Sequence, residues 1–91
     1  MPSLFTVFGY KIYFWANEGN EPVHVHVHVS RGKSSQSATK IWITQAGGTI
    51  SVNSSRIPKK DLVKLERFVA DNAFKIVSAW NIVFHRVSYY C

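Results

Sequence analysis

Alternation of apolar and polar residues is clearest between positions 22 and 30, which read Pro-Val-His-Val-His-Val-His-Val-Ser. A β-strand turns successive side chains to opposite faces, so the four valines would share one face and the three histidines the other. Proline cannot donate to a strand ladder, so Pro22 fits the first position of this strand. The pattern predicts a strand with a buried valine face and a half-exposed face made of His24, His26 and His28.

Alternation, together with β-branched and aromatic residues, predicts further strands around this one. They cover residues 4–8, 10–16, 38–44 and 49–52. Gly9, the Asn-Glu-Gly-Asn run at 17–20 and the Gln-Ala-Gly-Gly run at 45–48 have turn chemistry, and a polar, basic loop spans 30–37. Residues 1–55 are therefore predicted to be mainly β, in a small and mostly antiparallel sheet.

The spacing of the apolar residues changes to that of a helix after Pro58, a residue that fits a first helical turn. The first apolar stripe contains Leu62, Leu65, Phe68 and Val69, and the second contains Phe74, Ile76, Val77, Trp80, Val83 and Phe84. Residues 57–86 are predicted to be mainly helical. The pattern leaves open whether Asp71 and Asn72 separate two helices or one long helix continues.

The order of the elements indicates the fold class. Strands followed by helices favour an α+β fold, with one or two C-terminal helices packed on one face of a small, curved antiparallel sheet. The chain has 91 residues, of which 46% are hydrophobic. A chain of this length buries only about 60 to 65% of its unfolded surface and cannot supply two cores, so 1–91 is predicted to be a single domain.

Charge and cysteine content indicate which partners and which cellular compartment to expect. The net charge is +6, from eleven Lys and Arg against five acidic residues, which favours an acidic protein or nucleic acid as a partner. Cys91 is the one cysteine, so no internal disulfide can form. The N-terminus has no signal-peptide pattern and no window resembles a membrane span. We expect a cytoplasmic protein that does not insert in a membrane.

The histidines suggest a metal site first. At about 3.3 Å per residue, the Cα atoms of His24 and His26 would lie roughly 7 Å apart, and those of His24 and His28 roughly 13 Å apart. A bound metal would therefore use His24 and His26 and a third ligand. The candidates for that ligand are Glu21, His85 and Cys91. Imidazole clusters also scavenge zinc and nickel adventitiously, so no metal or other cofactor is expected.

Two other interpretations remain open. His24 and His26 could serve as acid and base on RNA, with Arg31, Lys33 or Lys40 stabilising the phosphate charge, which would make the protein a metal-dependent or histidine-based ribonuclease. Alternatively, the histidines are the structural polar face of a strand, and the same basic residues bind nucleic acid or an acidic protein without catalysis.

Several segments resemble a family of small bacterial proteins catalogued as domain of unknown function 4160. The resemblance covers nearly the whole chain, and its most specific element is the Pro-x-His-x-His strand. The matching residues are Met1-Pro2, Gly9 with Ile12-Tyr13-Phe14, the 17–20 turn, Pro22-Val23-His24-Val25-His26-Val27, the hairpin 38–52 and the helical half from Leu62 to Trp80-Asn81. His24 and His26 match the family motif, whereas His28 departs from it.

The resemblance implies a toxin-like component of a two-gene module similar to toxin–antitoxin pairs. Its neighbour would be a small antitoxin-like protein, domain of unknown function 2442, which neutralises it in a hetero-oligomer. The resemblance implies no particular molecular activity. Because His24 and His26 match the family motif, we expect the protein to act through the face that carries these two histidines.

Overall fold

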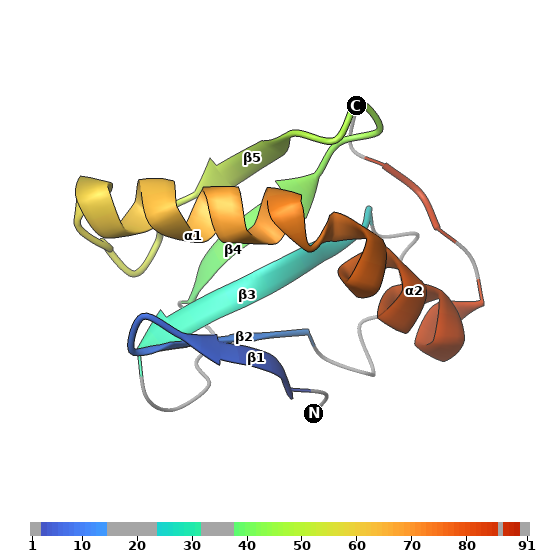
Figure 1. Cartoon of the computed structure of the whole chain (residues 1–91), viewed down its shortest axis with the longest axis horizontal. Helices are drawn as coiled ribbons and strands as arrows, with labels where there is room; N and C mark the ends of the chain where they lie inside the picture. The colour runs from blue at the N-terminus through green and yellow to red at the C-terminus, as the bar shows by residue number, and fades with distance from the viewer. Residues whose placement is uncertain (1–2, 15–23, 32–37, 86, 90–91) are drawn as a thin grey trace.

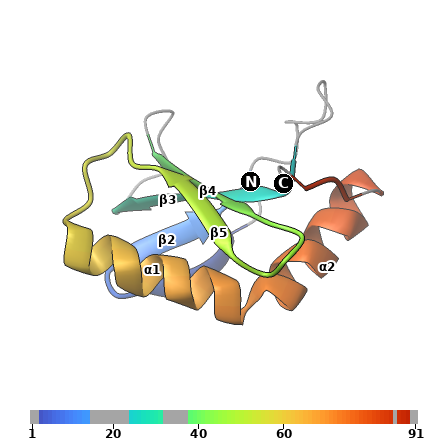
Figure 2. The same ribbon diagram turned by 90° about the horizontal axis from the view of Figure 1, so that it is seen from above.

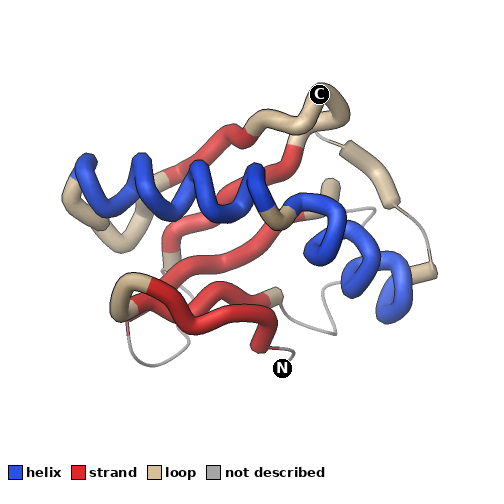
Figure 3. The backbone as a smooth tube through the Cα atoms, in the orientation of Figure 1, coloured by secondary structure: helices blue, strands red, loops and turns tan. Residues whose placement is uncertain are grey.

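The computed structural model describes residues 3–14, 24–31, 38–85 and 87–89 (Figure 1). The elements in chain order are β1 (Ser3–Val7), β2 (Tyr10–Tyr13), β3 (His26–Arg31), β4 (Thr39–Ile43), β5 (Thr49–Val52), α1 (Lys59–Asp71) and α2 (Ala73–Phe84). All strands precede both helices, and Figure 3 colours the strands red and the helices blue. The predicted α+β fold is confirmed.

The five strands form one antiparallel sheet in the order of the sequence, β1-β2-β3-β4-β5. Both helices lie on the same side of this sheet (Figure 2). β3 is the central strand, so its residues have neighbours on both sides: Val29 pairs with Ile12 of β2 and with Thr39 of β4. Within the described residues, β1 and β5 are the edge strands.

The hairpin between β1 and β2 is closed by two residues, Phe8 and Gly9, with φ of 55° and 81°. Two consecutive positive φ values are typical of the tight turn that matches the twist of a β-hairpin. Glycine adopts this conformation without strain, whereas a phenylalanine there is unusual. The sequence predicted a break at Gly9, and the structure extends the strained turn to Phe8.

The helical half consists of two helices. α1 begins at Lys59, directly after Pro58. The side-chain amide of Asn72 donates to the carbonyl of Phe68 at 2.9 Å, so it bonds back to the last turn of α1 rather than capping α2. This contact accompanies the break between the helices, which the sequence left open.

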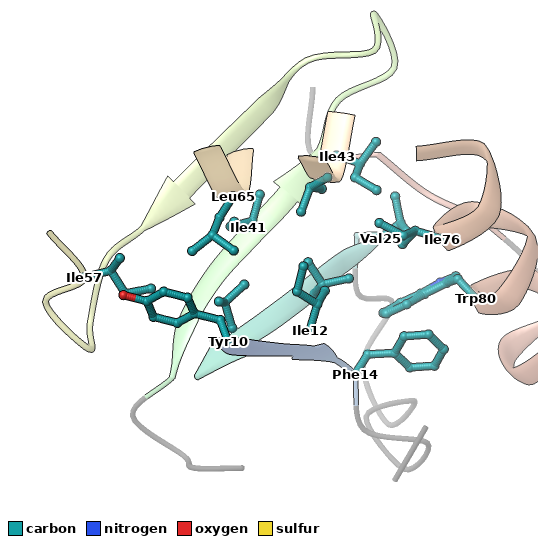
Figure 4. Packing of buried hydrophobic residues seen from close by; sticks show 13 residues of the cluster. Tyr10, Ile12, Phe14, Val25, Ile41, Ile43, Ile57, Leu65, Ile76 and Trp80 are labelled. Carbon is teal, nitrogen blue, oxygen red and sulfur yellow. The ribbon is translucent and has the colours of Figure 1, made fainter. Parts of the chain in front are cut away.

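The core lies between the sheet and the helices (Figure 4). Ile57 and Tyr10 lie at one end of it, and Phe14 and Trp80 at the other. Its residues are Tyr10, Ile12, Phe14, Val25, Val27, Val29, Ile41, Ile43, Ile57, Leu65, Val69, Ile76 and Trp80. The predicted burial of the valine face is thus confirmed for Val25, Val27 and Val29.

The C-terminal segment 87–89 packs beside the start of β3. The amide of Val25 donates to the carbonyl of Ser88 at 2.7 Å, and Val87 and Tyr89 pack against the core. The helices of the described part are too short or too polar to cross a membrane.

Candidate functional site

The histidines of the alternating segment do not all lie on one strand. β3 begins at His26, so His24 lies outside the strand that the alternation predicted to include it. Nδ1 of His24 is 3.3 Å from the hydroxyl of Ser88. The rings of His26 and His28 meet edge to face, with centroids 5.1 Å apart.

His26 and His28 are packed, with exposed fractions of 3% and 7%. Nδ1 of His26 is 2.7 Å from the carbonyl oxygen of His24, and a carbonyl can only accept, so Nδ1 carries the hydrogen. The His26 ring also lies 5.2 Å from that of Trp80, and His28 stacks on Tyr13 at 5.6 Å. The expectation of a half-exposed histidine face is wrong for these two residues, because aromatic side chains pack around them.

No metal centre is assembled in the part of the chain that the structure describes, where no three His, Cys, Asp or Glu side chains lie close enough to share an ion. Of the predicted third ligands, His85 is an exposed residue after α2. Glu21 and Cys91 lie outside the described residues.

The predicted basic residues lie apart. Lys40 lines a cleft of about 180 Å³ with His28, Trp42 and Ser54, and its ammonium is 5.5 Å from the centre of the Trp42 ring. Arg31 lies at the end of β3 and turns toward α1 instead. Lys33 lies outside the described residues. The catalytic role predicted for His24 and His26 stays a prediction.

A polar cluster that the sequence did not reveal joins three elements. The phenol of Tyr10 donates to Oδ2 of Asp61 at 2.9 Å, and it accepts a hydrogen bond of 2.8 Å from the guanidinium of Arg31. The guanidinium carbon is 5.2 Å from the centre of the Tyr10 ring. Tyr10 is 2% exposed, whereas Arg31 is exposed. A buried phenol therefore orients an arginine that faces solvent.

These bonds also affect the ionisation of Arg31. The hydrogen bond to Tyr10 raises the pKa of the guanidinium above its ordinary value, and the nearby charge of Asp61 adds to the rise. Arginine is cationic throughout the range in which proteins are studied. Arg31 is thus a fixed positive charge.

Arg31 and Tyr10 line a cleft of about 320 Å³ together with the loop that precedes α1, residues 55–58. Arg56 of this loop has a φ of 58°. The side chain of Asn53 holds the loop closed, since its oxygen accepts from the amide of Ile57 at 2.9 Å and its nitrogen donates to the Ile57 carbonyl at 2.8 Å. The cleft therefore has an arginine on each of two separate elements.

A third hollow lies between the β1–β2 turn and α1. It has a volume of about 230 Å³ and is lined by Phe8, Val63, Lys64, Arg67, Phe68 and Asp71. Phe8 is 55% exposed and Val63 46%. The ammonium of Lys64 is 5.8 Å from the centre of the Phe8 ring, and the Phe8 and Phe68 rings meet edge to face at 6.4 Å. We call this hollow the apolar groove.

Sequence reasoning identified Arg31 but missed Tyr10, Asp61 and Arg56. The sequence did contain a signal for the contact between Arg31 and Tyr10. Arg31 continues the valine side of the alternation and is thus expected to face the helices. The partner across the sheet follows from the register, in which Tyr10 pairs with Arg31. Nothing in the local sequence marks Asp61, which is 51 residues from Tyr10.

Comparison with known proteins identifies one family. The family model described as Domain of unknown function (DUF4160) matches residues 9–81. No curated protein and no solved structure matches the chain.

Proposed function

The chain belongs to the family of domain of unknown function 4160, and on this premise we propose that it is the toxin-like component of a bacterial two-protein module. A small antitoxin-like protein, encoded by the adjacent gene, binds and neutralises it. The observation that carries the proposal is the apolar groove beside the edge strand β1. The partner's segment is acidic and carries an apolar side chain.

The groove has the composition of a binding surface. It exposes Phe8 and Val63 side by side with the cationic Lys64 and Arg67. An aromatic anchor within a polar rim is typical of the residues that dominate protein–protein binding. Lys64 and Arg67 outnumber Asp71, the acidic residue that also lines the groove, and together with the net charge of +6 they favour a partner with carboxylates.

The backbone beneath the groove supports the same proposal. Phe8 occupies the left-handed region at φ 55°, where a bulky residue is disfavoured and Asn or Gly is usual. A strained residue that also exposes its aromatic ring contributes little to the stability of the isolated chain. Such strain is often found where a residue serves binding.

The edge strand adds a second type of contact. In the described part of the chain, β1 pairs with β2 alone, so its outer side offers backbone groups to an additional strand. An extended segment that pairs with β1 would pass directly beside Phe8. Strand addition to a sheet edge, with side chains held in a neighbouring pocket, is a common mode of peptide recognition.

The test begins with growth. We expect expression of the chain alone to arrest growth and co-expression of the adjacent-gene partner to relieve the arrest. Unaffected growth in the presence of soluble protein would overturn the toxin-like role.

Co-purification with the partner tests the groove. Val63→Asp places a carboxylate in the groove, and we expect it to abolish co-purification. Phe74→Asp is the matched control, because Phe74 is 84% exposed on α2 and does not line the groove. Equal retention of the partner by both variants would exclude the apolar groove as its binding surface.

A second candidate function is histidine-based hydrolysis of RNA, for which the sequence predicts His24 and His26 as acid and base. A cleft that places His28 beside Lys40 and Trp42 favours His28 as a further participant. The imidazole would transfer protons, the ammonium would stabilise phosphate charge, and the indole would stack on a base. Incubation with RNA, with and without a chelator, tests this function. Intact RNA under both conditions would exclude it.

A further inference from the structure

We propose that the cleft between Tyr10, Arg31 and the loop before α1 is a phosphate-binding site. It is separate from the apolar groove and does not depend on the toxin-like role. Its ligand is the phosphate group of a nucleotide or of a nucleic-acid backbone. Two guanidinium groups line the cleft, and the guanidinium is a donor that recognises phosphate.

Arg31 is held in place before any ligand arrives. Its guanidinium donates to the phenol of Tyr10 at 2.8 Å, and that phenol is in turn fixed by Asp61. Among the residues that the structure describes, Tyr10 is its one hydrogen-bond partner. A guanidinium has five N–H donors, so most remain for a ligand. Because the side chain is already oriented, binding loses less conformational freedom than it would with a mobile arginine.

Arg56 is positioned by a different device. The loop that carries it is closed by the two hydrogen bonds between Asn53 and Ile57. The hydroxyl of Thr39, on β4, donates to the Asn53 oxygen at 2.7 Å and is 2.6 Å from the hydroxyl of Ser55. The loop is thereby tied to the sheet, and it keeps Arg56 in the left-handed conformation.

Positive charge at this end of the molecule is only partly balanced. Lys59 and Lys60 occupy the first turn of α1, where the helix dipole disfavours cations. Asp61 is the acidic residue of this turn, and its carboxylate accepts the hydrogen bond from Tyr10 and offsets part of the charge of Arg31. An anion in the cleft would offset the mutual repulsion of these cations, whereas an empty cleft leaves it in place.

The shape of the cleft favours recognition of phosphate over recognition of a base. Its volume of about 320 Å³ is at the lower end of the range for small-molecule sites. Among the residues that the structure describes, Tyr10 is the one aromatic residue that lines the cleft, and its ring is buried beneath Arg31. No described lining residue therefore offers an open ring for stacking, and binding is expected to be independent of base identity.

The site can be tested by NMR titration of the full chain with three probes: inorganic phosphate, adenosine monophosphate and a single-stranded RNA octanucleotide. We expect all three to shift the amide signals of Arg31, Ser55 and Arg56. Tighter binding of the octanucleotide would identify nucleic acid as the source of the phosphate. Equal binding of all three would identify a small phosphate compound.

Arg31→Gln and Arg56→Gln are each expected to weaken phosphate binding about tenfold or more, the effect of losing a charge-assisted hydrogen bond. Lys75→Gln removes the same charge from an exposed position on α2 and is expected to weaken binding less than twofold. The amide spectrum of each variant shows whether it is folded. Arg56 is exposed and outside the core, so Arg56→Gln leaves the hydrogen bonds of Tyr10 unchanged.

Two results would overturn the site. The first is an absence of shifts at Arg31, Ser55 and Arg56 with all three probes. The second is an equal loss of affinity in Lys75→Gln and Arg56→Gln, which would show attraction by net charge alone. Because growth is not measured, neither result bears on the toxin-like role.

Discussion

The two faces of β3 differ in composition but hardly differ in burial. Val27 and Val29 are fully buried beneath the helices, and His26 and His28 on the other face are 3% and 7% exposed. The valines are covered by an apolar helix layer, whereas the histidines are packed among aromatic rings and tied to backbone. A polar strand face in the middle of a sheet is therefore not automatically a solvated one.

The face that was expected to carry the chemistry is not the one that exposes a charged group. The histidine face has the reactive groups but encloses them. The valine face ends in Arg31, an exposed cation held by Tyr10 and Asp61. We therefore expect binding at the rim of the valine face, at Arg31, and packing alone in its interior.

The largest expected effect comes from Trp80, which contacts both faces. Its ring lies 5.1 Å from Phe14, 4.4 Å from Phe84 and 5.2 Å from His26, and it is 1% exposed. We expect Trp80→Ala to lower the free energy of unfolding by about 3 to 5 kcal/mol, because it leaves a large cavity. Urea denaturation measures the change.

The exposed Phe74→Ala is the control for Trp80, and its effect should stay within about 0.5 kcal/mol. A loss of less than about 1 kcal/mol in Trp80→Ala would mean that the end of the sheet can collapse around the missing ring. The two faces of β3 would then not share a rigid neighbour.

His26→Ala tests whether the histidine face is structural. We expect a loss of about 1 to 3 kcal/mol in the free energy of unfolding, because the carbonyl of His24 loses its hydrogen-bond donor and the ring contact with Trp80 disappears. Val27→Ala, on the opposite face, serves as the comparison in the same urea experiment. An effect of His26→Ala below about 0.5 kcal/mol would be that of a surface residue and would contradict the packed histidine face.

The sequence alone could predict the features of the fold that depend on the spacing of apolar residues within a single element. Alternation assigned Val25, Val27 and Val29 to the core. Helical spacing assigned Leu65 and Val69, in the first stripe, and Trp80, in the second, to the layer that covers them. Both follow from the geometry of a single element, which neighbouring residues determine.

Contacts between distant elements could not be predicted in this way. Tyr10, Arg31 and Asp61 come from β2, β3 and α1, and their contact depends on strand register and on where α1 begins. Alternation specifies which face His26 occupies, but its exposure depends on aromatic residues of other elements. The break at Asn72 depends on a bond from its side chain to Phe68, which the apolar stripe does not encode.

Phe8 is an exception on the helix-covered side, because it is a large apolar residue left 55% exposed. We expect Phe8→Asn to raise the free energy of unfolding by about 1 kcal/mol, since asparagine tolerates the left-handed region. Thermal and urea denaturation measure the gain, and Phe8→Ala, which keeps the backbone strain, should show none. If the proposed partner binds the groove, the more stable Phe8→Asn variant will bind it less well.

A decrease in stability of Phe8→Asn would carry the opposite meaning. The contact of Phe8 with Phe68 would then outweigh the strain of the turn, and Phe8 would belong to the packing of the helix-covered face. Phe8 would then not be an exposed binding residue at the rim of the helix-covered face.

The smallest effect is expected from pH, and it concerns Arg31. The hydrogen bond to Tyr10 raises the pKa of Arg31 above its ordinary value. The contribution of the Arg31 charge to stability is therefore fully present below the unfolded-state pKa, and it is lost only as the pH rises through the still higher folded-state pKa. Both values lie well above neutral pH. Between about pH 5.5 and 9, the ratio of the sulfate dissociation constants of Arg31→Gln and the wild type should therefore stay constant.

Sulfate is the suitable anion for this measurement because its charge does not change over the range, whereas a phosphate monoester takes up a proton near pH 6. A ratio that changes more than about threefold between pH 5.5 and 9 would therefore mean that a titrating group other than Arg31 controls anion binding. The proposed site at Arg31, at the end of the valine face, would then be wrong.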